Sequence, residues 1–143
     1  MRVRRWCAAW CCVAVLPVLV TGCAATMGSA PVRDARPALY GAWELVGPDL
    51  APGTREVKLI TPHRFSWTTW DVATHEVLAA GGGTSVVHGR AYVETLEYSK
   101  GGTEGLVGQT LRFEVAINGD TMLQRGVEGG ALPELREVWR RVQ

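Results

Sequence analysis

From Leu39 to the end of the chain, hydrophobic and polar residues alternate in short runs separated by turn residues. A period of two is typical of β-strands with one buried face, and no stretch shows the period of a helix. The pattern predicts strands over Gly41–Val46, Glu56–Thr61, Arg64–Asp71, Glu76–Ala80, Thr84–Val87, Arg90–Ser99, Gln109–Ile117, Thr121–Val127 and Leu135–Val142. Glycines 81–83 separate two of these runs, where we expect a bulge or a tight corner.

The connections between these runs are short, which favours antiparallel neighbours. Asn118-Gly119 is the strongest hairpin signal, because both residues tolerate the positive φ of a type I′ turn. A series of antiparallel hairpins exposes unpaired edges unless it closes on itself. We therefore predict an all-β fold, a small up-and-down antiparallel β-barrel of about eight strands, with a two-sheet sandwich as the alternative. Such a barrel is just wide enough to be filled by side chains or to hold one small ligand.

The two ends of this region carry residues that are suited to closing a barrel. Gly41 lets the first strand bend sharply, and Trp43 supplies a large ring that can plug one end. The last strand carries Trp139 followed by Arg140 and Arg141, and either arginine could lie against Trp43. We predict that Gly41, Trp43, Trp139 and Arg140 close the barrel, although alternation alone does not choose between the two arginines.

Five pieces of sequence, taken in their order, resemble the bacterial lipocalin-like domains of the calycin group. They are Gly41-x-Trp43, the strand 64–71, the glycines 81–83, Tyr92-x-Glu94 and the closing Glu137-Val-Trp-Arg140. The resemblance covers roughly Leu39–Gln143 and implies a small β-barrel, with ligand binding by analogy. Lipocalins proper are longer, are often disulfide-bonded, and pair their tryptophan with a basic residue of the last strand.

Residues 1–22 are predicted to be an export signal. Three arginines in the first five residues precede Cys11–Val20, an apolar run that is too short to cross a membrane as a helix. Val20-Thr21-Gly22-Cys23 resembles the lipobox of bacterial lipoproteins, which implies cleavage before Cys23 and acylation of its thiol and of the new amino terminus. The alternative is an ordinary secretory signal that is cleaved near Ala24-Ala25.

The lipobox interpretation sets the domain organisation and the localisation. Residues 23–38 are rich in Ala, Gly, Ser and Pro and should form a flexible tether between the lipid anchor and the barrel domain, residues 39–143. More than one acyl chain is needed for durable membrane anchoring, which a fully acylated Cys23 would supply. By analogy with Gram-negative lipoproteins, Ala24 after this cysteine favours the outer membrane over the inner one, on the periplasmic side.

Cysteine content and charge narrow the function classes. All 4 cysteines lie at or before Cys23, so the barrel domain has no thiol for a disulfide or a nucleophile. Removal of residues 1–22 changes the formal charge from +1 to −2, because three arginines leave with them. No basic patch remains that would attract nucleic acid, and we expect no nucleic-acid partner.

The sequence also gives no support for a metal, a cofactor or catalysis. His63, His75 and His88 lie 12 and 13 residues apart beside predicted turns, whereas metal sites usually contain a close pair. Haem with His63 or His88 as axial ligand is an alternative without a motif. Glu94 and Glu97 fall on opposite faces of one strand, so they cannot act as an acid–base pair, and a Gly-x-Ser-x-Gly signature is absent. We therefore expect a protein that is not an enzyme.

One predicted strand carries a candidate ligand-binding surface. Tyr92, Glu94 and Tyr98 share a face of Arg90–Ser99, and an inward carboxylate would need a ligand or a partner such as an arginine or tyrosine. We predict a pocket lined by Phe65, Trp67, Tyr92, Glu94, Tyr98 and Phe113, with Glu94 fixing the orientation of the ligand. The alternative turns this face outward, with Glu94 in solvent and Val93 and Thr95 inside.

These inferences combine into a monomeric envelope lipoprotein, held to the membrane by its lipid anchor, whose non-enzymatic barrel binds a small apolar or amphipathic molecule. The alternative from a different class is a packed barrel that acts as a structural or protein-interaction module. That alternative predicts a filled interior and an exposed apolar patch on the outer face.

Overall fold

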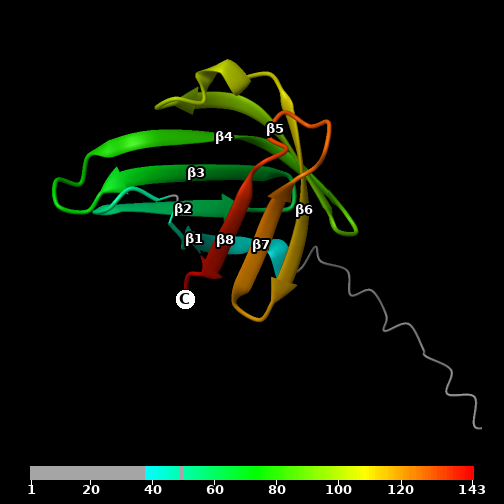
Figure 1. The fold of residues 1–143 in the computed structure, drawn as a ribbon, viewed down its shortest axis with the longest axis horizontal. Helices are drawn as coiled ribbons and strands as arrows, with labels where there is room; N and C mark the ends of the chain where they lie inside the picture. The colour runs from blue at the N-terminus through cyan, green and yellow to red at the C-terminus, as the bar shows by residue number, and fades with distance from the viewer. Residues whose placement is uncertain (1–37, 49) are drawn as a thin grey trace, which may run out of the picture. The chain divides into compact units, whose positions relative to one another are not determined.

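Eight antiparallel strands close into a barrel in the computed structural model, which describes residues 38–48 and 50–143 (Figure 1). They are β1 (Gly41–Leu45), β2 (Thr54–Ile60), β3 (Arg64–Asp71), β4 (Val77–His88), β5 (Ala91–Lys100), β6 (Thr110–Asn118), β7 (Thr121–Gly126) and β8 (Arg136–Arg141). Each strand pairs with the next, and β8 pairs with β1. The predicted all-β barrel is confirmed, and the sandwich alternative is wrong.

The predicted signal peptide, the lipidation site Cys23 and all of the predicted tether except Ala38 lie outside the described residues. Within the described part of the chain, no helix has the length and apolar character needed to span a bilayer.

The glycines 81–83 were predicted to separate two strands, and this prediction is wrong. They lie inside the continuous strand β4. The irregularity is on the neighbouring strand, because Gly82 pairs with Tyr98 and Gly83 pairs with Leu96, which leaves Glu97 as the extra residue of a bulge. At the bulge the two backbones approach closely, and a Cβ on Gly83 would lie 1.9 Å from the carbonyl oxygen of Thr95. A glycine is therefore required there by the close approach of β5.

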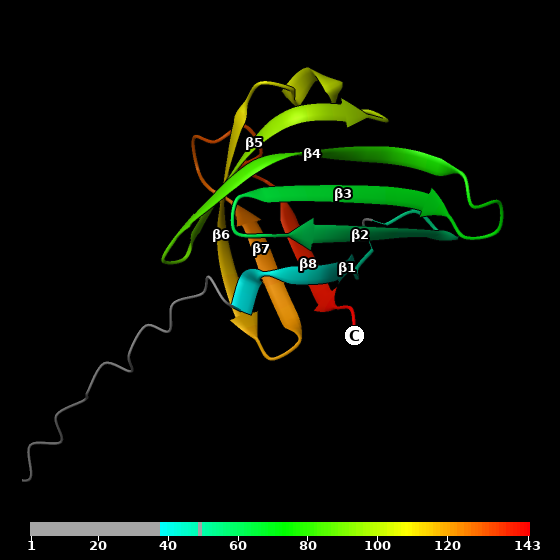
Figure 2. The same cartoon turned by 180° about the vertical axis from the view of Figure 1, so that it is seen from behind.

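The two ends of the barrel differ in their connections (Figure 2). At one end, the tight connections 61–63, 89–90 and 119–120 join β2–β3, β4–β5 and β6–β7. At the other end lie the longer segments 46–53, 72–76, 101–109 and 127–135, and the third of these carries the 3-10 helix η1 (Glu104–Leu106). The buried core includes apolar side chains at the first end: Leu39, Trp43, Ile60, Val87, Tyr92, Val115 and Met122. The first end is therefore closed by apolar side chains, and we call the second end, which carries the longer segments, the mouth of the barrel.

Trp43 and Arg141 join the first and last strands at the closed end. The Trp43 ring is fully buried, and its Nε1 donates to the carbonyl of Leu39 at 2.8 Å. The Arg141 guanidinium lies 4.1 Å from the centre of this ring and donates to the carbonyl of Tyr40 at 3.1 Å. The choice of Arg140 for barrel closure is wrong: Trp43 is directly opposite Arg141 in the register, so these two side chains share a face, whereas Arg140 is exposed.

Candidate functional site

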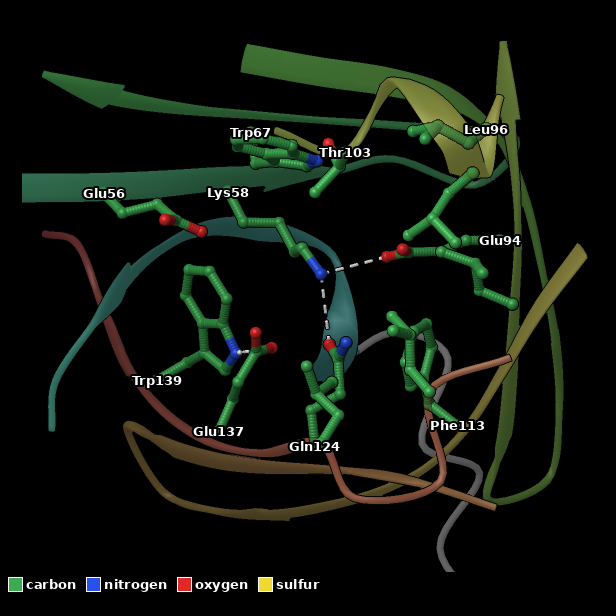
Figure 3. Close-up of a pocket in the computed structure, with 14 residues that line it drawn as sticks. Glu56, Lys58, Trp67, Glu94, Leu96, Thr103, Phe113, Gln124, Glu137 and Trp139 are labelled. Carbon is green, nitrogen blue, oxygen red and sulfur yellow. Dashed lines mark hydrogen bonds and ion pairs between the residues drawn. The ribbon is translucent and has the colours of Figure 1, made fainter. Parts of the chain in front are cut away.

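The mouth half of the barrel encloses a partly open cavity of about 210 Å³ (Figure 3). Its wall combines charged, amide, apolar and aromatic side chains: Glu56, Lys58, Trp67, Glu94, Leu96, Thr103, Leu106, Leu111, Phe113, Gln124, Leu132, Leu135, Glu137 and Trp139. Pockets for drug-sized ligands span about 300–1,000 Å³. The cavity, at about 210 Å³, is smaller than that range, so it suits a small molecule or one end of a larger molecule.

The structure brings only part of the predicted ligand-binding set to this cavity. Trp67, Glu94 and Phe113 line it, as predicted. Phe65 and Tyr92 also point into the barrel, but they are buried and do not line the cavity. The Tyr92 ring packs on Phe113 with centroids 6.3 Å apart, so it supports the cavity wall from behind. The inward orientation of the Tyr92–Glu94 face is confirmed.

Tyr98 was predicted to line the pocket, and this prediction is wrong. Its side chain is 53% exposed on the outer surface, where it lies over Gly82. The bulge at Glu97 adds one residue to β5, so the residues beyond it change faces relative to Tyr92, Glu94 and Leu96. A bulge of this kind follows from the register between two strands, which the alternation along one strand does not contain.

The predicted closure residue Trp139 also has a different position. It is fully buried, but it faces the cavity, and its Nε1 donates to Glu137 Oε2 at 3.0 Å. Lys58 Nζ lies 5.1 Å from the centre of the Trp139 ring. The ring therefore forms part of the cavity wall between an ammonium and a carboxylate, in addition to joining the core.

Lys58 is the central polar residue of the site. Its ammonium donates to Glu94 Oε1 at 3.0 Å and to Gln124 Oε1 at 3.2 Å (Figure 3). The Lys58 and Glu94 side chains are only 5% and 4% exposed, and Gln124 is buried as well. A buried charge is stable only when it is paired and hydrogen-bonded, and this pair meets both conditions. Glu94 thus has the partner that its inward position required, although that partner is a lysine.

The charges around Lys58 decide its protonation state. Burial acts to lower the pKa of Lys58, but the carboxylates of Glu94, Glu137 and Glu56 outweigh it, so the pKa lies above its ordinary value. The rings of Phe65 and Phe113 lie 5.9 Å from the ammonium and add a favourable electrostatic contribution. Lys58 is therefore positively charged throughout the neutral range.

Glu137 and Glu56 are the other two carboxylates of the cavity wall. Glu137 accepts from Trp139 Nε1, and Glu56 accepts from Thr69 Oγ1 at 2.8 Å. Within residues 38–48 and 50–143, neither carboxylate has a cationic nitrogen within 4.0 Å. Burial raises the pKa of Glu137, and the charge of Lys58 and the Trp139 hydrogen bond only partly oppose this effect. Glu137 is thus a half-buried acid whose carboxylate can still form an ion pair with a positively charged group.

Sequence reasoning missed Lys58, Gln124 and Glu137, and only the first of these had a usable signal. Lys58 is in phase with Ile60, which is buried, so one face of that strand carries both residues. An inward Glu94 also demands a cation, and the barrel domain contains few lysines. Gln124 alternates with Met122 on β7, but nothing in that run distinguishes an inward amide from an exposed one.

The remaining polar candidates are outside the cavity. His63, His75 and His88 are all exposed. Glu97 is also exposed and pairs with Arg64 at 2.5 Å on the outer surface. In the described residues, no group of three or more His, Cys, Asp or Glu side chains is arranged to hold a metal ion.

Comparisons with protein-family models and with curated proteins find no match to this chain. The resemblance to lipocalin-like domains accordingly stays a prediction, based on the motif residues.

Proposed function

We propose that the barrel binds one small amphipathic molecule in its mouth half and does not transform it chemically. The observation that carries this proposal is the cavity itself, which three aromatic rings and a buried polar cluster line from different sides (Figure 3). Trp67, Phe113 and Trp139 offer apolar contact area, while polar groups near Lys58 can fix an orientation. Ligand sites in proteins typically combine an apolar lining with a few such polar groups.

The geometry also limits the size of the ligand. The part that enters the barrel must fit about 210 Å³, so a long chain would leave most of its length outside. The segments 101–109 and 127–135 border the entrance, where they contribute Thr103, Leu106, Leu132 and Leu135. These segments can cover a part of the ligand that projects from the cavity.

Tryptophan fluorescence tests this proposal directly. Trp67 lines the cavity, whereas Trp70 lies on the outer face beneath Arg55, whose guanidinium is 5.6 Å from the ring. Small amines, alcohols and acids with short apolar bodies should include a molecule that changes the fluorescence saturably. Trp67→Phe should reduce this change, and Trp70→Phe should not. Silent fluorescence, together with an absence of binding heat across the whole panel, would contradict the proposal.

Export and lipid anchoring form the second part of the proposal. The support is the order of Arg2, Arg4 and Arg5, the apolar run 11–20 and the lipobox-like Val20-Thr21-Gly22-Cys23. Bacteria that express the full chain and are fed labelled palmitate should incorporate the label, and Cys23→Ser should abolish it. Equal labelling of both chains would refute the anchor.

A packed interaction module is the second candidate function, and one observation favours it. Leu123 and Val138 are directly paired across β7 and β8 on the outer face, where they are 37% and 39% exposed. Such a pair could contact another protein. Replacing both residues with threonine should leave small-molecule binding unchanged, which separates the two candidates. The cavity, however, departs from the filled interior that this candidate predicts.

A further inference from the structure

The charges that line the cavity are unbalanced. Three carboxylates, those of Glu56, Glu94 and Glu137, face it together with the ammonium of Lys58. Lys58 is already engaged by Glu94 and Gln124 through hydrogen bonds of 3.0 and 3.2 Å. Within the described part of the chain, the other two carboxylates accept hydrogen bonds only from the neutral donors of Trp139 and Thr69. The wall therefore has an excess of negative charge beside its aromatic rings.

We infer that the ligand is a small organic cation, a protonated amine with a short apolar body, whose ammonium group binds between Glu137 and Glu56. This inference rests on the proposed function and names the chemical class of the ligand. Figure 3 shows both carboxylates on the side of the cavity away from Glu94, with the Trp139 ring beside them. An ammonium there would gain charge-assisted hydrogen bonds, and its apolar body would contact Trp67 and Phe113.

The same arrangement disfavours an anionic amphiphile such as a fatty acid. Among the residues that the structure describes, Lys58 is the only cation that lines the cavity. Turning its ammonium toward a ligand carboxylate would leave Glu94 as an unpaired buried charge. Glu56 and Glu137 would also repel that carboxylate at short range. A neutral alcohol avoids this repulsion but lacks the attraction of a cation.

The protonation of Glu137 provides an independent readout. Its pKa is raised by burial, while Lys58 and Glu56 on β2 and Glu94 on β5 are the other charged groups that line the cavity. A cation binds the ionised form of Glu137 in preference to the neutral form. Amine affinity should therefore increase as the pH rises through the pKa of Glu137, and binding should release protons in that range.

Calorimetric titration of the full-length protein with hexylamine, hexanol and hexanoate at neutral pH tests the inference. Hexylamine should bind roughly tenfold or more tightly than hexanol, and hexanoate should bind most weakly. Glu137→Gln should weaken hexylamine binding by roughly tenfold without changing the affinity for hexanol. Glu56→Gln provides a second variant of the same kind, and Glu114→Gln, on the exposed face of β6, should change neither affinity.

The outcomes separate the inference from the proposed function. Hexanol or hexanoate binding as tightly as hexylamine would overturn the cation assignment and leave a small-molecule pocket in place. Equal weakening of hexylamine and hexanol in Glu137→Gln would assign that residue a structural role and also overturn the inference. If no compound of any charge binds, the proposed function fails together with the cation assignment.

Discussion

The ammonium of Lys58 on β2 donates a 3.0 Å hydrogen bond to Glu94 on β5, in the middle of the barrel. The two strands are not neighbours in the sheet, so the ion pair spans the interior. It lies between the apolar core at the closed end and the cavity at the mouth. The pair therefore gives the cavity a polar inner surface where a packed barrel would continue its apolar core.

Breaking this ion pair should destabilise the fold more than removing it entirely. Lys58→Met leaves the Glu94 charge buried without a cation, which should lower the free energy of unfolding by about 3–5 kcal/mol. Adding Glu94→Gln removes the unpaired buried charge and should recover much of the lost free energy of unfolding. Urea denaturation of both variants measures the difference, with exposed Lys100→Met as the control. A double variant that is no more stable than the single one would contradict this account.

Glu137→Gln should stabilise the protein at neutral pH. Because burial raises the pKa of Glu137, the folded state holds its proton more tightly than the unfolded state does. Stability from this difference is fully present below the unfolded pKa, near 4.5, and is lost as the pH rises through the folded pKa. Glutamine is neutral at every pH and can still accept from Trp139 Nε1.

Thermal unfolding across the pH range measures this effect. The melting temperature of Glu137→Gln should exceed that of the wild type at neutral pH, and the two should converge below pH 4.5. The same variant is expected to bind hexylamine more weakly, so stability and ligand affinity should change in opposite directions. A variant that is less stable than the wild type at neutral pH would show that the Glu137 charge is well compensated.

The sequence predicted the barrel well because strand alternation and turn residues act locally. The range Arg64–Asp71 was predicted with the bounds that β3 has, and Phe65 and Trp67 point inward as their alternation indicated. The alternation along one strand gave the wrong face for Tyr98, because a bulge in the pairing of β5 with β4, opposite Gly82 and Gly83, decides on which face this side chain lies. The site was harder to predict, because Lys58 and Glu94 are 36 positions apart and meet only when the sheet closes.

Arg141 and Arg140 form a natural pair for testing barrel closure. Arg141→Ala removes the guanidinium from the Trp43 ring and its hydrogen bonds to the carbonyls of Ala38 and Tyr40, the former at 2.5 Å. We expect a loss of about 1–3 kcal/mol in the free energy of unfolding. Arg140→Ala removes an exposed side chain and should change stability by less than about 0.5 kcal/mol. Chemical denaturation of both proteins gives the comparison, and equal losses would show that stacking on Trp43 contributes nothing specific.

Gly83 is the position where a single methyl group should disturb the barrel wall. In Gly83→Ala the new Cβ would lie 1.9 Å from the Thr95 carbonyl oxygen, and β5 could avoid this contact only by moving away from β4. The bulge that turns Tyr98 outward would then be disrupted, and Leu96 would shift at the cavity wall. We expect a loss of about 2 kcal/mol or more, as for other strained or overpacked sites.

The matched control is Gly47→Ala, because a Cβ at Gly47 meets nothing within 4 Å and the residue has no positive φ. This variant should be as stable as the wild type or slightly more so, since alanine restricts the unfolded chain. Hydrogen exchange should localise the damage in Gly83→Ala to the amides of β4 and β5, with β7 and β8 still protected. If both variants unfold at the same denaturant concentration, the close approach of β5 does not require a glycine at position 83.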